Sequence, residues 1–285
     1  MARRLFVFGL GFSGLAVARR ARALGWSVGG SCTGADKARR LAAEGIDAVV
    51  FDSSTKLALD AASHILSTVA PLTTGDPVVD RFTTSARPEW LGYLSTTGVY
   101  GDAGGGWVDE DSPALPTQAR SQRRLDAEHA WQRRADQMAT PLHRFRLPGI
   151  YGPGRSALDQ VRAGTARRID RPGQVFSRIH VEDIASAVLA SMAAPAAPPG
   201  RIYNVADDLP AAPAEIVAEA CRLLDVPAPP LVPFAEAAPQ MSEMARSFYA
   251  ESRRVRAERI KRELGVVWRY PTYREGLAAI ADATR

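Results

Sequence analysis

The sequence is poor in cysteine and in lysine. Its two cysteines, Cys32 and Cys221, lie far apart and have no metal-ligand spacing, so neither a disulfide framework nor a metal site is expected. This fits a reducing, cytoplasmic compartment. Only three lysines stand among 36 basic residues, and together with the abundant Ala and Pro this skew toward arginine is typical of a GC-rich bacterial genome.

Long apolar runs and concentrated charge are also missing. The first apolar stretch, residues 5–18, follows Arg3-Arg4 like a signal peptide, but it is shorter than the roughly 20 residues of a membrane span and carries an ordered glycine pattern. The net charge of +5 is spread over 285 residues. We therefore expect neither a membrane nor a nucleic acid as partner.

A glycine motif near the start predicts a dinucleotide site. An apolar run at 5–8 reads as a buried strand, a helical pattern covers 15–24, and 26–31 reads as a second strand. Between the first strand and the helix stands a full G-x-G-x-x-G, in which the glycines permit a tight turn, a close approach of the pyrophosphate and close helix packing. The predicted cofactor-binding residues here are Gly9, Gly11, Phe12, Ser13 and Gly14.

The end of the second predicted strand bears on the choice of cofactor. An NAD site usually has Asp or Glu there, whereas this chain has Ser31, Cys32 and Thr33. Lys37, Arg39 and Arg40 follow closely, which favours NADP over NAD. The alternative is that these charges form the solvated face of the next helix.

Strands and helices alternate through the next hundred residues. Apolar runs at 46–51, 65–69, 91–95 and 143–147 predict further strands, and a long helix is expected over 117–138. This alternation predicts an α/β fold with a Rossmann-type doubly wound parallel sheet. Ligands bind beyond the carboxyl ends of such strands, so the further cofactor candidates are Asp52, Thr68, Val69, Ala70, Thr96, Pro148, Gly149 and Ile150.

Five segments resemble a known family in order and spacing. They are Leu94-Ser95-Thr96-Thr97-Gly98-Val99-Tyr100-Gly101-Asp102 and residues 107–111, 146–154, 179–184 and 203–205. Together they resemble the extended short-chain dehydrogenase/reductases, the NAD-dependent epimerase/dehydratase-like group. The resemblance implies a Rossmann domain over 1–150, completed by about 175–195, and a smaller substrate lobe from 151–174 and 196–285. The charged stretch 252–264 predicts a helix whose polar face covers that lobe.

The resemblance also implies a catalytic set that this chain holds only in part. In the family a Ser/Thr orients the substrate and a Tyr-x-x-x-Lys pair supplies the acid/base and holds the nicotinamide ribose. Thr96 matches the first role, whereas Arg120 and Arg124 stand in the Tyr and Lys positions. Arginine stays protonated, so Arg120 cannot exchange a proton, although Arg124 can still donate to a ribose. The alternative is that both pair with Asp126, Glu128 or Asp136 on the helix.

Other residues offer substitutes for the missing groups. Tyr100 after the strand-end turn is a candidate acid, with packing as the alternative. Tyr151 and His180 are substrate-site candidates that could equally be structural, and Arg155 is a candidate for holding an anionic group. The resulting atypical member of the family would lack the usual acid/base, whose contribution is typically about 10²–10⁴-fold.

Two functions remain open at this stage. The first is an NAD(P)-dependent oxidoreductase or epimerase-like enzyme that uses a non-standard acid on a small-molecule carbonyl or hydroxyl substrate, such as a sugar or nucleotide sugar. The second is a non-catalytic NAD(P)-binding regulator that senses redox state, which the missing Tyr and Lys favour. By resemblance, the long helix at 117–138 also offers a homodimer surface.

Overall fold

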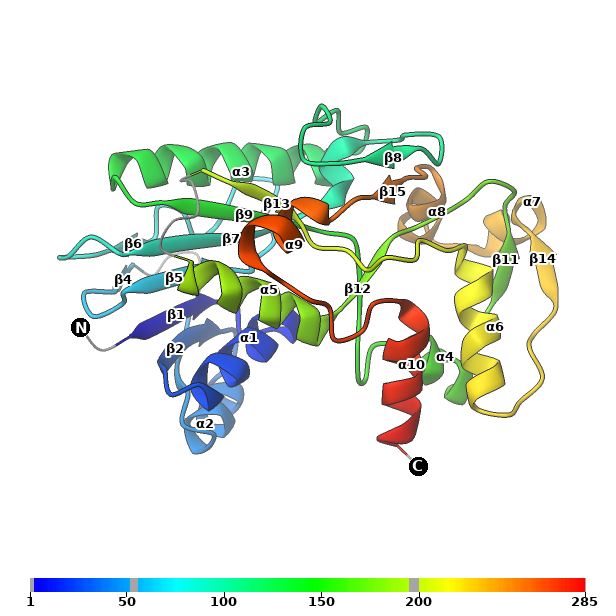
Figure 1. Ribbon diagram of the computed structural model, residues 1–285, viewed down its shortest axis with the longest axis horizontal. Helices are drawn as coiled ribbons and strands as arrows, with labels where there is room; N and C mark the ends of the chain where they lie inside the picture. Colours follow the sequence, from blue (N-terminus) through cyan, green and yellow to red (C-terminus); the bar gives the residue numbers. More distant parts are fainter. Residues whose placement is uncertain (1–2, 52–55, 195–199, 285) are drawn as a thin grey trace.

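The computed structural model describes residues 3–51, 56–194 and 200–284. Its centre is a parallel sheet of seven strands in the order β13-β9-β7-β5-β1-β2-β3 (Figure 1). The strands are β1 (Arg4–Phe8), β2 (Ser27–Cys32), β3 (Asp47–Val50), β5 (His64–Ser67), β7 (Trp90–Thr96), β9 (Leu142–Leu147) and β13 (Ile202–Asn204). The chain order reverses at β1, which pairs with β2 on one side and β5 on the other. The predicted doubly wound Rossmann sheet is confirmed.

Helices cover both faces of this sheet. Helix α3 (Ala119–Gln137) lies on one face, and α1 (Phe12–Ala23), α2 (Ala35–Ala43) and α5 (Val181–Ala193) lie on the other (Figure 1). Strand β1 supplies both cores because its side chains alternate. Leu5 and Val7 pack with the α1 and α5 side, whereas Phe6 and Phe8 pack with the α3 side.

A smaller lobe follows the sheet on its right in Figure 1. Its helices α4, α6 and α10 contact one another, and its core includes Tyr151, Leu158 and Leu277. The described elements of this lobe and its hinge are β10 (Gly149–Tyr151), α4 (Ala157–Arg162), β11 (Arg168–Asp170), β12 (Arg178–His180), α6 (Pro213–Leu223), β14 (Leu231–Pro233), α7 (Phe234–Ala237), η2 (Ala238–Gln240), α8 (Glu243–Tyr249) and α10 (Tyr273–Asp282). Parallel pairs β10–β12 and β11–β14 tie the lobe together.

The tail differs from the single charged helix expected at 252–264. Its first part forms β15 (Arg254–Val255), which pairs with β8 (Trp107–Val108), and only its second part is helical, as α9 (Glu258–Leu264). Helix α9 contacts α5 and β13, and Ile260 is fully buried in the core below the large sheet. The few apolar side chains of the stretch therefore hold it on the Rossmann side. Strand β13 likewise joins the large sheet from within the stretch 196–285.

Short elements complete the chain. They are β4 (Leu57–Ala58) paired with β6 (Phe82–Thr83), and the 3₁₀ turn η1 (Thr97–Tyr100) directly after β7. Both cysteines are buried, and neither forms a disulfide. Over the described ranges, none of the helices combines the length and apolarity needed to cross a membrane.

Candidate functional site

The glycine loop joins β1 to α1 and leaves the start of the helix open. Gly9 has a positive φ of 86°, which favours glycine. A Cβ on Gly14 would lie 2.2 Å from the Gly9 carbonyl oxygen, so the loop and helix meet more closely than any side chain permits. At Gly11, the N-cap of α1, a Cβ would meet no atom within 4 Å. The loop therefore presents free N–H groups and open space to an anion.

Two predicted cofactor ligands instead support this loop from behind. The Gly9 amide donates to the buried hydroxyl oxygen of Ser31 at 3.0 Å, and the Thr68 hydroxyl donates to the Gly9 carbonyl at 2.7 Å. Cys32 is also buried, and its thiol donates to the Gly34 carbonyl. The side chains of Ser31 and Cys32, both predicted cofactor ligands, are thus engaged in hydrogen bonds inside the protein.

The remaining strand-end candidates lie at the same edge of the sheet. Thr33, just after β2, is exposed, as is Ala70 beyond β5. Val69 is half-buried, and its carbonyl oxygen accepts from Arg124. Asp52 lies outside the described residues. On α2, Arg39 bonds the neighbouring Asp36, and both side chains are exposed.

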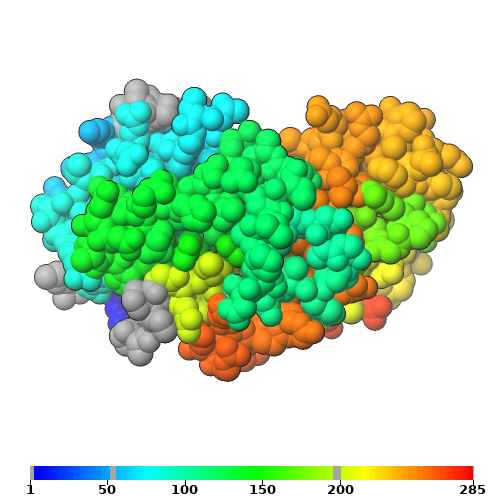
Figure 2. All heavy atoms as spheres, turned by 90° about the horizontal axis from the view of Figure 1, so that it is seen from above, coloured from blue at the N-terminus to red at the C-terminus, as the bar shows by residue number. Residues whose placement is uncertain are grey.

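A cleft of about 690 Å³ runs along the carboxyl ends of β5, β7 and β9 and is closed on its far side by α8. The predicted residues that the cleft brings together are Ala70, Thr96, Arg120, Arg124, Pro148, Gly149, Ile150 and Arg155. Figure 2 shows the stretch before α3 (teal) beside the segment that carries α8 (orange). The Gln118 amide donates to the Ser247 carbonyl at 2.9 Å and fixes this contact.

Arg124, in the family's Lys position, ties two strand ends together. Its Nη1 donates to the carbonyls of Val69 and Leu94 at 3.2 and 3.1 Å and to the Tyr93 hydroxyl at 3.0 Å. The side chain is half-buried and lines the cleft. Arg124 therefore places its positive charge at the sheet edge, and much of its donor capacity serves the protein.

The alternative that Arg120 and Arg124 pair with acids of their own helix is not what the structure shows. Glu128 accepts from Arg146, with Nη2–Oε2 at 2.8 Å, in a pair whose side chains are 4% and 1% exposed. Glu128 also accepts from the Ser95 hydroxyl. Asp126 and Asp136 accept from the glutamines four residues before them.

Arg120, in the family's Tyr position, points into the cleft. Its guanidinium carbon lies 4.4 Å from the centroid of the Phe248 ring on α8. Thr96 lines the same cleft, and its hydroxyl oxygen accepts from the Gly98 amide at 3.1 Å as the cap of η1. At the position where the resemblance implies the family's proton donor, a cation therefore lines the cleft together with Thr96.

Tyr100, the predicted substitute acid, is not among the described residues that line the cleft. It is 4% exposed, and its hydroxyl donates to Asn204 Oδ1 at 2.8 Å. Burial raises the pKa of Tyr100 to about 12, although the nearby Arg146 opposes the shift. The turn after β7 directs this ring inward against β9 and β13, where it packs.

His180, a predicted substrate residue, lies at the hinge and is not among the described residues that line either cavity. Its Nδ1 accepts from the Glu182 amide at 3.2 Å and caps α5, and its ring packs between Tyr151 and Tyr270. Burial, and secondarily Arg269, lowers the pKa of His180 to about 4. The ring is therefore neutral at pH 7.

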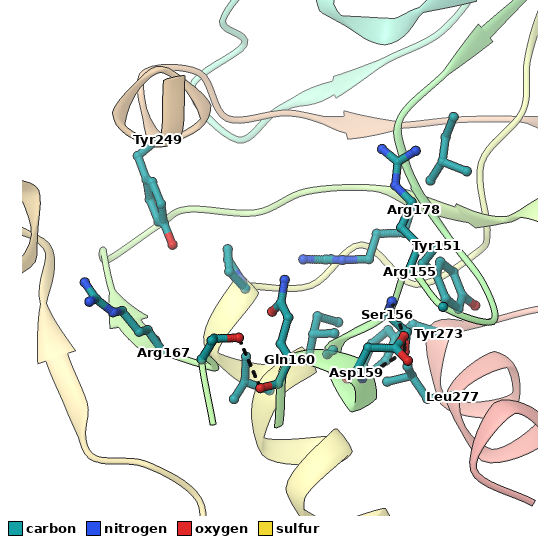
Figure 3. Close-up of a pocket in the computed structure, with 17 residues that line it drawn as sticks. Tyr151, Arg155, Ser156, Asp159, Gln160, Arg167, Arg178, Tyr249, Tyr273 and Leu277 are labelled. Atoms are coloured by element: carbon teal, nitrogen blue, oxygen red, sulfur yellow. Dashed lines mark hydrogen bonds between the residues drawn. The ribbon is translucent and has the colours of Figure 1, made fainter. Parts of the chain in front are cut away.

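Tyr151 and Arg155 line a second cavity of about 610 Å³ in the smaller lobe (Figure 3). Tyr151 is 7% exposed, and its hydroxyl is buried where a Cβ on Gly276 would touch it, so its role there is largely packing. Arg155 is exposed and lines both cavities. Its guanidinium carbon lies 5.4 Å from the centroid of the Phe12 ring, at the start of α1.

Sequence reasoning missed the contribution of α8. Tyr249 reaches from this helix toward the second cavity (Figure 3) and also lines the main cleft. Of the described residues around the main cleft, Tyr249 is the one tyrosine. It is half-buried, and burial raises its pKa. The adjacent aromatics Phe248 and Tyr249, in an otherwise charged tail, were the signal in the sequence.

Positive charge dominates the main cleft. Its described lining includes one acidic residue, Glu251, which pairs with Arg253 at 2.8 Å. Several cations that line one cleft attract anions. The arginines that line it are Arg120, Arg123, Arg124, Arg155, Arg178 and Arg253.

The strand order, the open glycine loop and the cleft along the carboxyl ends of β5, β7 and β9 define a dinucleotide-binding protein of the extended short-chain dehydrogenase/reductase type. The family model of the NAD dependent epimerase/dehydratase family matches residues 79–206. The chain is 30% identical over 247 residues to Protein YeeZ of Escherichia coli K12, an alignment that covers 80% of this chain and 86% of that protein. The chain belongs to the NAD dependent epimerase/dehydratase family.

Solved structures agree with this assignment. A functionally unknown conserved protein from Silicibacter pomeroyi DSS is 43% identical, with a TM-score of 0.88 over 99% of each chain. The human epimerase family protein SDR39U1 with NADPH is 18% identical, with a TM-score of 0.80 over 98% of this chain and 99% of that one. MoeE5 in complex with UDP-glucose and NAD is 19% identical, with a TM-score of 0.78 over 99% of this chain and 98% of that one. At these lower identities the likeness shows the fold.

Proposed function

We propose that this protein binds NADP and oxidises or reduces a carbonyl or hydroxyl group of an anionic small molecule, such as a sugar or nucleotide sugar. The observation that carries the proposal is a cleft at the carboxyl ends of the strands that contains Thr96 and a row of arginines, one of which, Arg155, lies over Phe12 at the start of α1. The resolved ligands of two structural neighbours, NADPH and NAD with UDP-glucose, support this class of chemistry.

The residues present fit a dinucleotide. The space above Gly11 and the unfilled N-terminus of α1 suit its pyrophosphate, and Arg155 beside Phe12 adds a cation at that point. At the other end, exposed Thr33 and the cations Lys37 and Arg39 suit a 2′-phosphate. When bound, the cofactor would supply or accept the hydride.

The protein's own residues supply the remaining steps. Thr96 would orient the reacting oxygen of the substrate, and Arg124 would hold positive charge beside the ribose. Arg120 cannot give up its proton at working pH, so the acid must come from elsewhere. Tyr249 is our candidate, since it is the tyrosine that the described cleft lining contains, and its hydroxyl would donate a proton to the substrate oxygen as the hydride arrives.

The test is hydride transfer by the purified protein. NADPH oxidation and NADP reduction are followed at 340 nm (from the absorbance of the reduced nicotinamide) across carbonyl compounds, sugars and nucleotide sugars. Turnover that requires an anionic substrate supports the proposal. Tight cofactor binding without turnover on any of them contradicts it and favours a second function, a redox-sensing NAD(P)-binding protein, which the arginines at positions 120 and 124 also permit.

A further inference from the structure

The six arginines of the cleft differ in how they use their donors. Arg124 donates to Val69, Tyr93 and Leu94, and Arg178 donates to the Phe176 and Ala211 carbonyls at 3.1 and 3.0 Å. Arg253 pairs with Glu251. Three of the six arginines therefore use donors for contacts within the protein.

Arg120 and Arg155 use their guanidinium groups differently. Within the described part of the chain, each guanidinium lies over an aromatic ring: Arg120 over Phe248 and Arg155 over Phe12. A guanidinium stacked on a ring face is attracted to the π system while its in-plane N–H donors stay available. Each of these two arginines is thus oriented by a ring and ready to bind an anion at its edge.

The two positions differ in what they face. Arg155 lies over Phe12 at the start of α1, where a cofactor pyrophosphate would bind, so its anion belongs to the cofactor. Arg120 lies on α3 in the Tyr position, one helical turn before Arg124, and lines the cleft together with Thr96. An anion at Arg120 would therefore belong to the substrate.

The ring under Arg120 is held in place from both sides. The Gln118 amide binds the Ser247 carbonyl, and the Thr117 hydroxyl binds Glu251, so the start of α3 is tied to both ends of the segment that carries Phe248. The orientation of Arg120 therefore depends on contact between the two lobes. The guanidinium and the ring together form a preorganised wall of the substrate site.

We propose that Arg120 binds a carboxylate or phosphate group of the substrate, and that the family's Tyr position has become an anion-recognition position in this chain. The inference rests on the proposed function only in calling the bound molecule a substrate. The anion site itself is a property of the free cleft. A planar guanidinium can bind either oxyanion through two parallel hydrogen bonds.

The test is the binding of two probes, inorganic phosphate and malonate, to the NADP-saturated protein by isothermal titration calorimetry. Saturation with NADP keeps the glycine loop and Arg155 occupied. We expect saturable binding of at least one probe, and Arg120→Gln should weaken it by about tenfold or more, the usual effect of losing a charge-assisted hydrogen bond. The tighter probe identifies the kind of anion.

Three further variants make the result specific. Arg120→Lys keeps the charge and loses the planar fork, so it should recover only part of the affinity. Arg133→Gln changes an exposed arginine on the same helix and should bind like the wild type. Arg155→Gln, at saturating NADP, should weaken the binding of the probes less than Arg120→Gln does, because Arg155 lies over Phe12 at the start of α1.

Three outcomes overturn the inference: no saturable binding of either probe, wild-type affinity in Arg120→Gln, or loss that follows Arg155 and not Arg120. Because the readout is binding, it separates this inference from the proposed function. A protein that binds the probe through Arg120 but transfers no hydride would retain the anion site and refute only the proposed reaction.

Discussion

Two glycines of the β1–α1 loop should differ in how the same substitution affects the stability of the protein. In Gly14→Ala, the new Cβ would lie 2.2 Å from the Gly9 carbonyl oxygen and 3.1 Å from the Thr68 hydroxyl. The shortfall from van der Waals contact at the carbonyl is about 1 Å. Since this neighbour is backbone and its carbonyl is held by Thr68, the loop or the helix must move.

The expected cost of Gly14→Ala is about 1–3 kcal/mol, as in overpacked cores. For a chain of this size, each kcal/mol corresponds to a melting temperature lower by about 2–4 °C. Cofactor affinity should fall as well, because the displaced loop no longer aims its N–H groups at the phosphates. Both effects are measurable, by differential scanning calorimetry and by quenching of tryptophan fluorescence with NADPH.

Gly11→Ala is the matched control, because its Cβ meets no atom within 4 Å in the free protein. We expect an unchanged melting temperature, since the residue already has an extended φ of −82°. We also expect cofactor affinity to fall by about tenfold or more, because the methyl group would occupy the space that the pyrophosphate needs. If Gly11→Ala bound NADPH normally, the placement of the cofactor on this loop would be wrong. Wild-type stability in Gly14→Ala would refute the close contact between the loop and the helix.

Three other perturbations test the proposed chemistry and the buried charges. Tyr249→Phe should lower turnover by about 10²-fold or more while NADPH affinity stays constant, whereas Tyr270→Phe, away from the cleft, should retain full activity; equal rates in the two variants would exclude Tyr249 as the acid. Lys37→Ala combined with Arg39→Ala should weaken NADP by about tenfold and leave NAD unaffected, as competition titrations would show; equal losses for both cofactors would contradict a 2′-phosphate site. Burial raises the pKa of Asp207 to about 8. The folded state therefore keeps a proton that the unfolded chain releases near pH 4. The stability that this proton contributes is lost as the pH rises from about 4 through 8. Urea unfolding should therefore show Asp207→Asn gaining stability over the wild type between about pH 5 and 8, and a constant difference between the two would refute the shifted pKa.

The Rossmann half could be predicted because its signals are local. Strand β1 reads as an unbroken apolar run, and the glycine spacing fixes the turn and helix that follow, so the predicted run 5–8 and the observed Arg4–Phe8 nearly coincide. The tail could not be predicted in this way. Three of its apolar residues, Val255, Ala257 and Ile260, are buried. The elements that carry Val255 and Ile260 contact β8 and α5, which lie far away in the chain, and no periodicity within 252–264 indicates these contacts.

Side-chain direction was the other limit. Ser31 stands at the end of a strand beside the expected cofactor, yet its hydroxyl turns back to the Gly9 amide. Tyr100 follows the same kind of strand end, yet the 3₁₀ turn sends its ring toward Asn204. A sequence shows that such residues reach the edge of the sheet. Which way they then point is decided by hydrogen-bond partners more than 20 residues away.

The replaced catalytic pair shows how these two limits combine. The spacing from Arg120 to Arg124 could be read directly, and so could the loss of a proton donor. The residues that we propose to compensate lie on α8, about 125 residues later in the chain, and the contacts of Arg120 with Phe248 and of Gln118 with Ser247 bring them to the same cleft. A guanidinium resting on that ring cannot act as an acid, but it can hold an anion. The proposed function and the proposed anion site therefore describe one change, in which anion recognition is assigned to Arg120 on α3 and proton donation to Tyr249 on α8.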